Sequence, residues 1–172
     1  YCREHILTPA RLNTDVQLIG GGPRRQDSVR NGLEAISDEE GIVLIHDGVR
    51  PLVTEALIEA CIRGARKWGA CIPAVSAVDT PKQVNDGVVE RTIARDKLLF
   101  AQTPQAFRLS LIRQAHHEAK SKKWSATDDA ALIERMGGRV HIISGIRENI
   151  KLTTPEDLDL AEYYFSRRAR SD

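Results

Sequence analysis

The stretch Ile42-Val43-Leu44-Ile45-His46-Asp47-Gly48-Val49-Arg50-Pro51 decides how the rest of the chain is interpreted. Its first residues form a continuous apolar run, which is typical of a strand that is buried on both faces. The run ends in an acid, a glycine and an arginine, and a segment of helical periodicity follows at residues 54–67. This order predicts a strand at residues 42–46, a polar loop at its carboxyl end and a helix that returns the chain.

The same alternation continues on both sides of this stretch. We expect further strands at residues 16–19, 70–73 and 140–144, and helices at residues 26–36, 54–67, 109–123, 127–135 and 155–166. The last helix has a clear start, with Thr154 as N-cap, Pro155 at the first position and Asp157 completing a capping box. Repeated strand–helix alternation predicts an α/β fold with a mainly parallel sheet flanked by helices.

One segment interrupts the alternation. Residues 82–84 and 88–91 flank Asn85-Asp86-Gly87, whose turn chemistry favours a β-hairpin. A hairpin inside an α/β chain usually projects from it. Two interpretations stay open: a surface excursion without a role, or an arm that reaches a neighbouring subunit and helps to close a site there.

Composition limits the classes of partner. The 172 residues carry 25 basic and 24 acidic side chains, so no overall charge attracts nucleic acid or a membrane, and 5% aromatic residues offer little for base stacking. No apolar run approaches the roughly 20 residues that span a bilayer. The three cysteines, Cys2, Cys61 and Cys71, lack a CxxC spacing and read as reduced thiols. We expect one cytoplasmic domain over residues 1–172 that binds small molecules, without nucleic-acid or membrane partners.

Two polar segments follow predicted strands. The cluster Gly20-Gly21-Gly22 leads into a helix that includes Ser28, so it is either a ligand-binding turn with free backbone amides or an ordinary strand-to-helix turn. In the second segment, Asp47 can hold Mg²⁺ against phosphates, and Gly48 lets a ligand approach the backbone. Arg50 braces the loop, meets a phosphate or pairs with Asp47, and His46 reads as a satisfied residue at the sheet end.

Two further groups have open interpretations. Asp79-Thr80-Pro81-Lys82, Arg95 and Thr103-Pro104-Gln105 bracket the hairpin, where Arg95 is suited to a phosphate or is a solvated charge. Thr127 is a helix cap or a ligand contact, and Lys151 is a surface lysine or a cation that grips phosphate. Spacing alone does not choose between these interpretations.

Six motifs in order carry a resemblance to a known family: GG-P-RRQDSV-NGL, VLIHDGVRPLVT, VDTPKQV, TIARDKLLFAQTPQAF, ATDDAALIERMG and ENIKLTTPEDLDLAE. Together they resemble the bacterial 2-C-methyl-D-erythritol 4-phosphate cytidylyltransferases over nearly the whole chain. The resemblance implies a Rossmann-like nucleotidyltransferase domain and a homodimer. In that dimer an arm at about residues 79–104 completes the partner's polyol-phosphate site.

The resemblance also implies the site residues. The nucleotide would contact Gly21, Gly22, Ser28, Asp47 and Gly48, and the substrate would contact Asp79, Thr80, Arg95, Thr127 and Lys151. Arg95, Lys151 and Asp47 would be catalytic, with Asp47 also next to the metal. Pro23 departs from the acidic residue that is common in the family's glycine loop, which affects contacts to the base.

The implied reaction moves CMP from CTP to 2-C-methyl-D-erythritol 4-phosphate with Mg²⁺ and releases pyrophosphate, a step of non-mevalonate isoprenoid precursor synthesis. Alignment and charge neutralisation then suffice, without a covalent enzyme intermediate. The family opens with a strand and a glycine-rich loop that grips the triphosphate. This chain starts beyond that loop, so we expect such a segment in the natural protein and expect activity to depend on it.

Two alternatives remain. A ribitol 5-phosphate cytidylyltransferase would share the fold and core motifs, with a different acceptor. A truncated relative that binds nucleotide or sugar phosphate without turnover would explain the absent loop.

Overall fold

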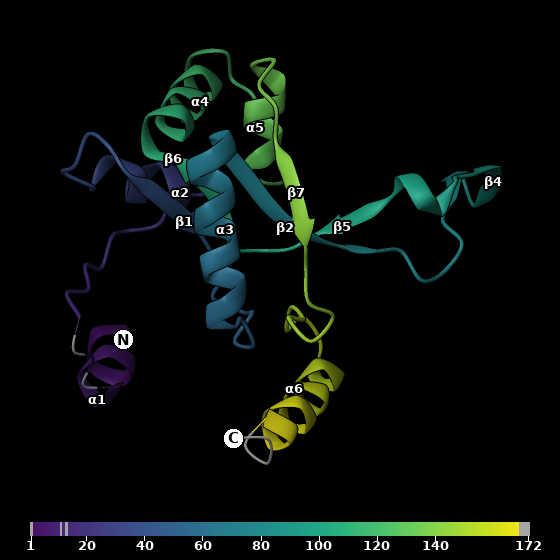
Figure 1. Ribbon diagram of the computed structural model, residues 1–172, viewed down its shortest axis with the longest axis horizontal. Helices are drawn as coiled ribbons and strands as arrows, with labels where there is room; N and C mark the ends of the chain where they lie inside the picture. The colour runs from purple at the N-terminus through teal and green to yellow at the C-terminus, as the bar shows by residue number, and fades with distance from the viewer. Residues whose placement is uncertain (1, 11, 13, 169–172) are drawn as a thin grey trace. The chain divides into compact units, whose positions relative to one another are not determined.

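The computed structural model describes residues 2–10, 12 and 14–168, and the chain divides into two compact units, residues 1–38 and 39–172. Figure 1 shows the helices and strands of both units. Within the described residues, no helix is long and apolar enough to cross a membrane.

The first unit is helical where it has regular structure. A π-helical turn, Arg3–Leu7, continues into α1 (Thr8–Ala10), and α2 (Arg25–Glu34) confirms the helix expected near residues 26–36. The strand expected at residues 16–19 was wrong, because these described residues form no strand. Val16, Leu18 and Ile19 are each more than 40% exposed, at 42%, 43% and 45%. An apolar run becomes a strand only where a neighbouring strand pairs with its backbone, which the local pattern does not reveal.

The second unit contains the sheet and its helices. Its strands are β1 (Ile42–Ile45), β2 (Ala70–Ser76), β3 (Lys82–Asn85), β4 (Val88–Thr92), β5 (Leu99–Ala101), β6 (Gln105–Arg108) and β7 (His141–Ser144). Its helices are α3 (Glu55–Trp68), the 3-10 turn Arg95–Lys97, α4 (Leu109–Ser121), α5 (Ala130–Arg135) and α6 (Pro155–Arg168). The predicted α/β class is confirmed, and the strands β5 and β6 were not predicted.

The sheet is mixed, which corrects the expectation of a mainly parallel sheet. Its order is β1-β6-β2-β5, with β7 pairing with β2. Among the residues that the structure describes, only the β2–β7 ladder of this sheet is parallel, whereas β1–β6, β2–β6 and β2–β5 are antiparallel. The reason is that β5 and β6 return from the hairpin, which reverses the chain without a crossover helix. Because β1 and β2 are both antiparallel to β6, their carboxyl ends and the start of β6 lie at the same sheet edge.

Helix α3 covers this sheet and shows how the sequence sets the packing. Thr54 accepts a hydrogen bond from Leu57 N (3.3 Å) and caps its start, while Gly69, with φ 89°, ends it. The helix contacts β1, β2, β6 and β7. Its close approach needs Gly64, since a Cβ there would lie 2.3 Å from Cys71 Sγ. The buried core at this contact consists of Leu57, Cys61, Ala65, Cys71 and Ala106.

The expected hairpin is confirmed as β3 and β4, a separate two-stranded sheet. Asp86 and Gly87 take positive φ values of 46° and 77°, which is the conformation that this turn chemistry favours. All residues of both strands are exposed, and in Figure 1 the hairpin lies away from the β1-β6-β2-β5 sheet. The sequence therefore predicted both strands of the hairpin to within one residue at each end.

Candidate active site

Two oppositely charged side chains meet at the carboxyl ends of β1 and β7. Lys151 Nζ lies 3.2 Å from Asp47 Oδ2, and Arg50 Nε lies 3.8 Å from the same oxygen. The Asp47 side chain is 14% exposed, whereas Lys151 is 45% exposed. Asp47 thus sits at the bottom of the cluster and Lys151 covers it from solvent, with a donor group that a ligand can reach.

The backbone at Asp47 is fixed by a chain of hydrogen bonds. Asp47 N donates to Thr103 Oγ1 (3.0 Å), and the Thr103 hydroxyl lies 3.0 Å from His46 Nδ1. His46 Nε2 lies 3.0 Å from Arg50 O, which can only accept. With a hydrogen on Nε2 and a lone pair on Nδ1, the His46 ring satisfies every partner in this chain. His46 is therefore a satisfied residue at the sheet end, as the sequence suggested.

Arg50 braces two loops rather than only pairing with Asp47. Its Nη1 donates to Asn149 O (2.7 Å), and the backbone of Leu152 donates to Val49 O (2.8 Å). Burial lowers the pKa of the Arg50 guanidinium, and the charge of Asp47 opposes that shift. An arginine stays protonated at neutral pH, so the cluster holds two cations around one carboxylate.

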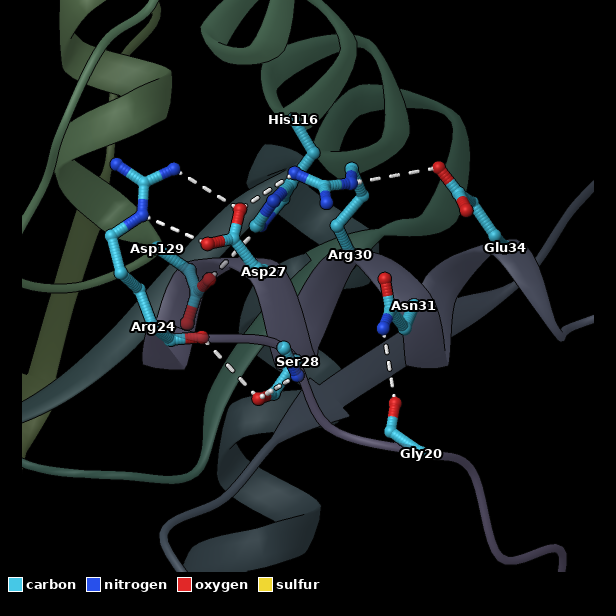
Figure 2. A network of polar contacts seen from close by, with 10 residues as sticks. Gly20, Arg24, Asp27, Ser28, Arg30, Asn31, Glu34, His116 and Asp129 are labelled. Atoms are coloured by element: carbon cyan, nitrogen blue, oxygen red, sulfur yellow. Dashed lines mark hydrogen bonds and ion pairs between the residues drawn. The ribbon is translucent and has the colours of Figure 1, made fainter.

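The segment that carries Thr127 is anchored by buried polar groups. Gln105 donates to Asp128 Oδ2 (2.8 Å) and accepts from Asp129 N (3.2 Å) and Ala130 N (3.1 Å). Asp129 also lies 3.0 Å from the buried His116 (Figure 2). Helix α5 begins at Ala130 with Asp129 at the N-cap position, so Thr127 is not the cap. Thr127 is exposed just ahead of this anchored turn.

The remaining substrate candidates gather at the base of the hairpin. Arg95 Nη1 donates to Val78 O (3.2 Å), directly before Asp79 and Thr80. All three candidate side chains are exposed. The structure thus groups Arg95 with Asp79 and Thr80, separately from the contact between Asp47 and Lys151.

The glycine loop belongs to the first unit and closes on itself, as Figure 2 shows. Gly22 N donates to Ser28 Oγ (3.0 Å), and Asn31 Nδ2 donates to Gly20 O (3.0 Å). A Cβ at Gly22 would lie 2.4 Å from Asp27 Cβ, so this position requires glycine. Asp27 accepts hydrogen bonds from Arg24 (2.8 Å) and Arg30 (2.8 Å), which hold the pKa of its carboxyl well below the usual range. Gly48, the other candidate glycine, has open space where a Cβ would be.

The volumes of the cavities do not identify the site around Asp47 and Lys151. A cavity of about 640 Å³ is lined by Gly41, Ile42, Arg66 and Arg108, which belong to the amino end of β1 and its surroundings. Asp47 follows the opposite end of that strand. A smaller groove of about 370 Å³ includes Ser76, Ser144, Gly145 and Arg147, at the carboxyl ends of β2 and β7. In open α/β sheets ligands collect at carboxyl ends, so the smaller groove is on the relevant edge.

The side chains present fit one mode of magnesium binding. In the part of the chain that the structure describes, no group of three His, Cys, Asp or Glu is placed to hold a metal ion. Mg²⁺ at phosphate-transfer sites is commonly held by one or two carboxylates together with substrate phosphates. The single carboxylate of Asp47 fits that arrangement.

Sequence reasoning missed the residues that connect these loops. Gln102, Thr103 and Asn149 are 5%, 5% and 0% exposed, and they make the hydrogen bonds that join the loops after β1 and β7. Thr103 was noted only as a polar residue near the hairpin. The available signal was a polar run, Gln102-Thr103-Pro104-Gln105, between apolar residues.

The chain is similar to known proteins over almost its whole length. A model of the 2-C-methyl-D-erythritol 4-phosphate cytidylyltransferase family matches residues 3–167. A protein of that name from Syntrophotalea carbinolica is 51% identical over 164 residues, covering 95% of this chain and 70% of the relative. One from Geobacillus kaustophilus is 50% identical over 165 residues, covering 96% and 72%.

Solved structures agree with these sequence matches. The 4-diphosphocytidyl-2C-methyl-D-erythritol synthase of Anaerococcus prevotii superposes with a TM-score of 0.84 at 34% identity, covering 91% of this chain and 73% of that one. The 2-C-methyl-D-erythritol 4-phosphate cytidylyltransferase of Thermus thermophilus gives 0.80 at 33% identity, covering 90% and 78%.

Proposed function

Because the chain belongs to the 2-C-methyl-D-erythritol 4-phosphate cytidylyltransferase family, we propose that it moves CMP from CTP to 2-C-methyl-D-erythritol 4-phosphate and releases pyrophosphate. This reaction serves non-mevalonate isoprenoid precursor synthesis. The observation that carries the proposal is the contact of Lys151 with Asp47 at 3.2 Å, at the sheet edge where α/β enzymes bind ligands.

The reaction needs alignment and charge neutralisation. An oxygen of the acceptor's phosphate attacks the α-phosphorus of CTP, and pyrophosphate leaves on the opposite side. Lys151 and Arg95 are the catalytic cations, which hold the acceptor phosphate and offset the negative charge that builds up around the phosphorus. Thr127, Asp79 and Thr80 orient the acceptor through hydrogen bonds.

Asp47 has a double role in this proposal. It holds Lys151 before substrate binds, and it is the protein carboxylate that would hold Mg²⁺ together with the nucleotide phosphates. When bound, Mg²⁺ neutralises phosphate charge. Arg50 keeps the Asp47 loop in place through Asn149 O (2.7 Å), so the carboxylate does not have to be reorganised during the reaction.

The nucleotide is recognised mainly by backbone groups. In the first unit, Gly21 and Gly22 would let the nucleotide approach the main chain, and Ser28 keeps the glycine loop closed through Gly22 N (3.0 Å). In the second unit, Gly48 would allow the same close approach to the backbone after β1. Position 22 requires glycine because a Cβ there would clash with Asp27, and this restriction is consistent with a loop of fixed shape.

We further propose a cytoplasmic homodimer with a shared active site. The hairpin exposes Val84, Val88 and Val89 by 58%, 68% and 53%, and Val84 pairs with Val89 across the two strands. A second subunit that covers this arm, residues 79–104, would bury them. Arg95 at the arm's base would then serve the partner's acceptor site.

The decisive experiment uses protein from the complete gene, with CTP and Mg²⁺ and each of two acceptors. Pyrophosphate release is followed, and the nucleotide product is identified by mass spectrometry. Rapid release with 2-C-methyl-D-erythritol 4-phosphate is expected. Faster turnover of ribitol 5-phosphate would replace the proposed acceptor. Calorimetric binding of CTP without product from either acceptor would favour a binding module.

A further inference from the structure

We propose that Gln102 is a positioning residue for the reaction, because its carboxamide fixes the turn that delivers Lys151 to Asp47. This inference rests on the proposed function, since it assumes that Lys151 acts on the substrate. It concerns a side chain that lies behind the cluster rather than in it.

Gln102 occupies the short connection between β5 and β6. Its backbone N–H donates to Pro73 O (2.8 Å), so the residue is attached to the middle of β2. Its side chain is 5% exposed. A buried amide must find partners for its donor and acceptor, since an unpaired buried polar group costs more than a satisfied one contributes.

Both ends of the carboxamide bind one turn. Gln102 Oε1 accepts from Ile146 N (3.1 Å), and Gln102 Nε2 donates to Ile146 O (2.8 Å). The same Nε2 lies 3.3 Å from Asn149 O, the last residue of the turn at residues 146–149. One side chain therefore imitates the two-bond pairing of a neighbouring strand and holds a loop segment that has no strand beside it.

The position of Gly145 supports this close fit. A Cβ at Gly145 would lie 2.5 Å from Gln102 Oε1, and 3.0 Å from the carbonyl of Ala74. The chain thus needs glycine at 145 so that the turn can approach the carboxamide. The amide of Gly145 also donates to Ala74 O (2.8 Å), which sets where the turn begins.

The turn leads directly to the catalytic candidates. Asn149 O accepts from both Gln102 Nε2 and Arg50 Nη1, so the carboxamide and the guanidinium share one acceptor. Lys151 follows two residues later, and Leu152 N returns to Val49 O (2.8 Å). Gln102 fixes the middle of this loop, between its two backbone anchors. Without that bond, Lys151 loses its defined approach to Asp47.

The test is a double-mutant cycle in protein from the complete gene. Gln102→Leu keeps the size of the side chain and removes both hydrogen-bonding groups. We expect kcat to fall roughly tenfold to a hundredfold, as for other supporting residues behind a site. In a Lys151→Ala background the same change should alter kcat less than about twofold, because the residue that it positions is gone.

Two controls separate this effect from general instability. Gln114→Leu makes the same substitution on the exposed face of α4, and it should leave kcat unchanged. Native-state hydrogen exchange should show faster exchange of the Ile146 amide in Gln102→Leu, with amides of β2 unaffected. If Gln102→Leu does not fold, Gln102→Glu retains the acceptor for Ile146 N and lacks the donor for Ile146 O, so a loss of kcat is expected there too.

The outcomes distinguish the two proposals. Full activity in Lys151→Ala would overturn the assigned role of Lys151. A strong loss in Lys151→Ala together with normal kcat in Gln102→Leu would overturn only the positioning role. Losses that multiply in the double variant would also overturn it, because Gln102 would then act independently of Lys151.

Discussion

Lys151 Nζ lies 3.2 Å from Asp47 Oδ2, and the two residues follow strands β7 and β1, which are not neighbours in the sheet. A pair in which one member is 45% exposed contributes about 0–1 kcal/mol to stability. The fold gains little from this contact. The proposed function explains the arrangement in another way, as a cation held ready for an anionic ligand.

Replacing Lys151 by alanine tests that explanation. We expect kcat/KM for the acceptor to fall by about 100-fold to 1,000-fold, the usual effect of removing one donor that stabilises the transition state. The unfolding free energy should change by less than about 1 kcal/mol, since the lysine is partly exposed. Lys120→Ala, on the exposed side of α4, is the control. A large loss of stability in Lys151→Ala would mean that the residue is structural.

Subunit mixing tests the shared site. Arg95→Ala and Lys151→Ala subunits are each expected to be inactive as homodimers. After subunit exchange, random pairing gives heterodimers in which one of the two sites has both native side chains, so about a quarter of all sites recover. Turnover is measured before and after exchange. Absence of any recovery, with exchange verified by mass spectrometry, would place both side chains in the same subunit's site.

Acid unfolding tests the cap of α6. Asp157 Oδ2 accepts from Thr153 N (2.7 Å) and Thr154 N (2.8 Å), and these bonds lower the pKa of Asp157 below the ordinary value of an aspartate. A lowered pKa in the folded state means that the stabilisation is complete above the unfolded pKa and is lost as pH falls through the folded pKa.

Urea unfolding of the protein and of Asp157→Asn should therefore differ at pH 7 and pH 5, and the difference should shrink below about pH 4. Asp159→Asn, an exposed carboxylate on the same helix, is the control. A difference that grows at low pH would contradict the assigned sign.

Titration of the cysteine thiols tests whether the contact between α3 and β2 stays closed in the folded protein. Cys61 and Cys71 are fully buried, and burial, reinforced by the nearby Cys71, raises the pKa of Cys61 to about 12. Cys2 is exposed. At pH 8, an aromatic disulfide reagent should thus react rapidly with one thiol of the folded 172-residue chain and with all three after denaturation. Rapid reaction of more than one thiol before denaturation would show that the contact between α3 and β2 opens easily.

Structural features that depend on interactions within a few residues were predicted correctly from the sequence. The hairpin turn at Asp86 and Gly87 and the start of α6 at Pro155 were both predicted from short-range signals, and the helix expected from residue 54 begins at Glu55. These features depend on φ preferences and on hydrogen bonds within a few residues, which the sequence displays directly.

Long-range pairing was not predictable in the same way. Strands β5 and β6 exist because they pair with β2 and β1, and Thr103-Pro104 between them reads locally as a loop. The run at residues 16–19 shows the reverse error, since β-type residues formed no strand. The direction of β6 also determined whether the sheet was parallel or mixed, and no spacing rule contains that information.

The candidate site shows the same difference between local features, which the sequence revealed, and long-range contacts, which it did not. Asp47 and Lys151 were recognisable as charged residues after strands, and the structure brings them together. The contacts of Thr103 with Asp47, and of Gln102 with Ile146, join residues that are far apart in the chain. Such contacts leave no periodicity, so only the fold identifies them.

Residues 102–105 contact three separate loops, through Gln102 to Ile146, through Thr103 to Asp47 and through Gln105 to Asp129. A change in this segment therefore disturbs several loops in one step, and no single compensating substitution repairs all of them. An exposed loop residue such as Arg147 does not connect several loops in this way. The three loops can therefore change one at a time at their exposed tips, whereas a change in residues 102–105 is transmitted to all three loops together.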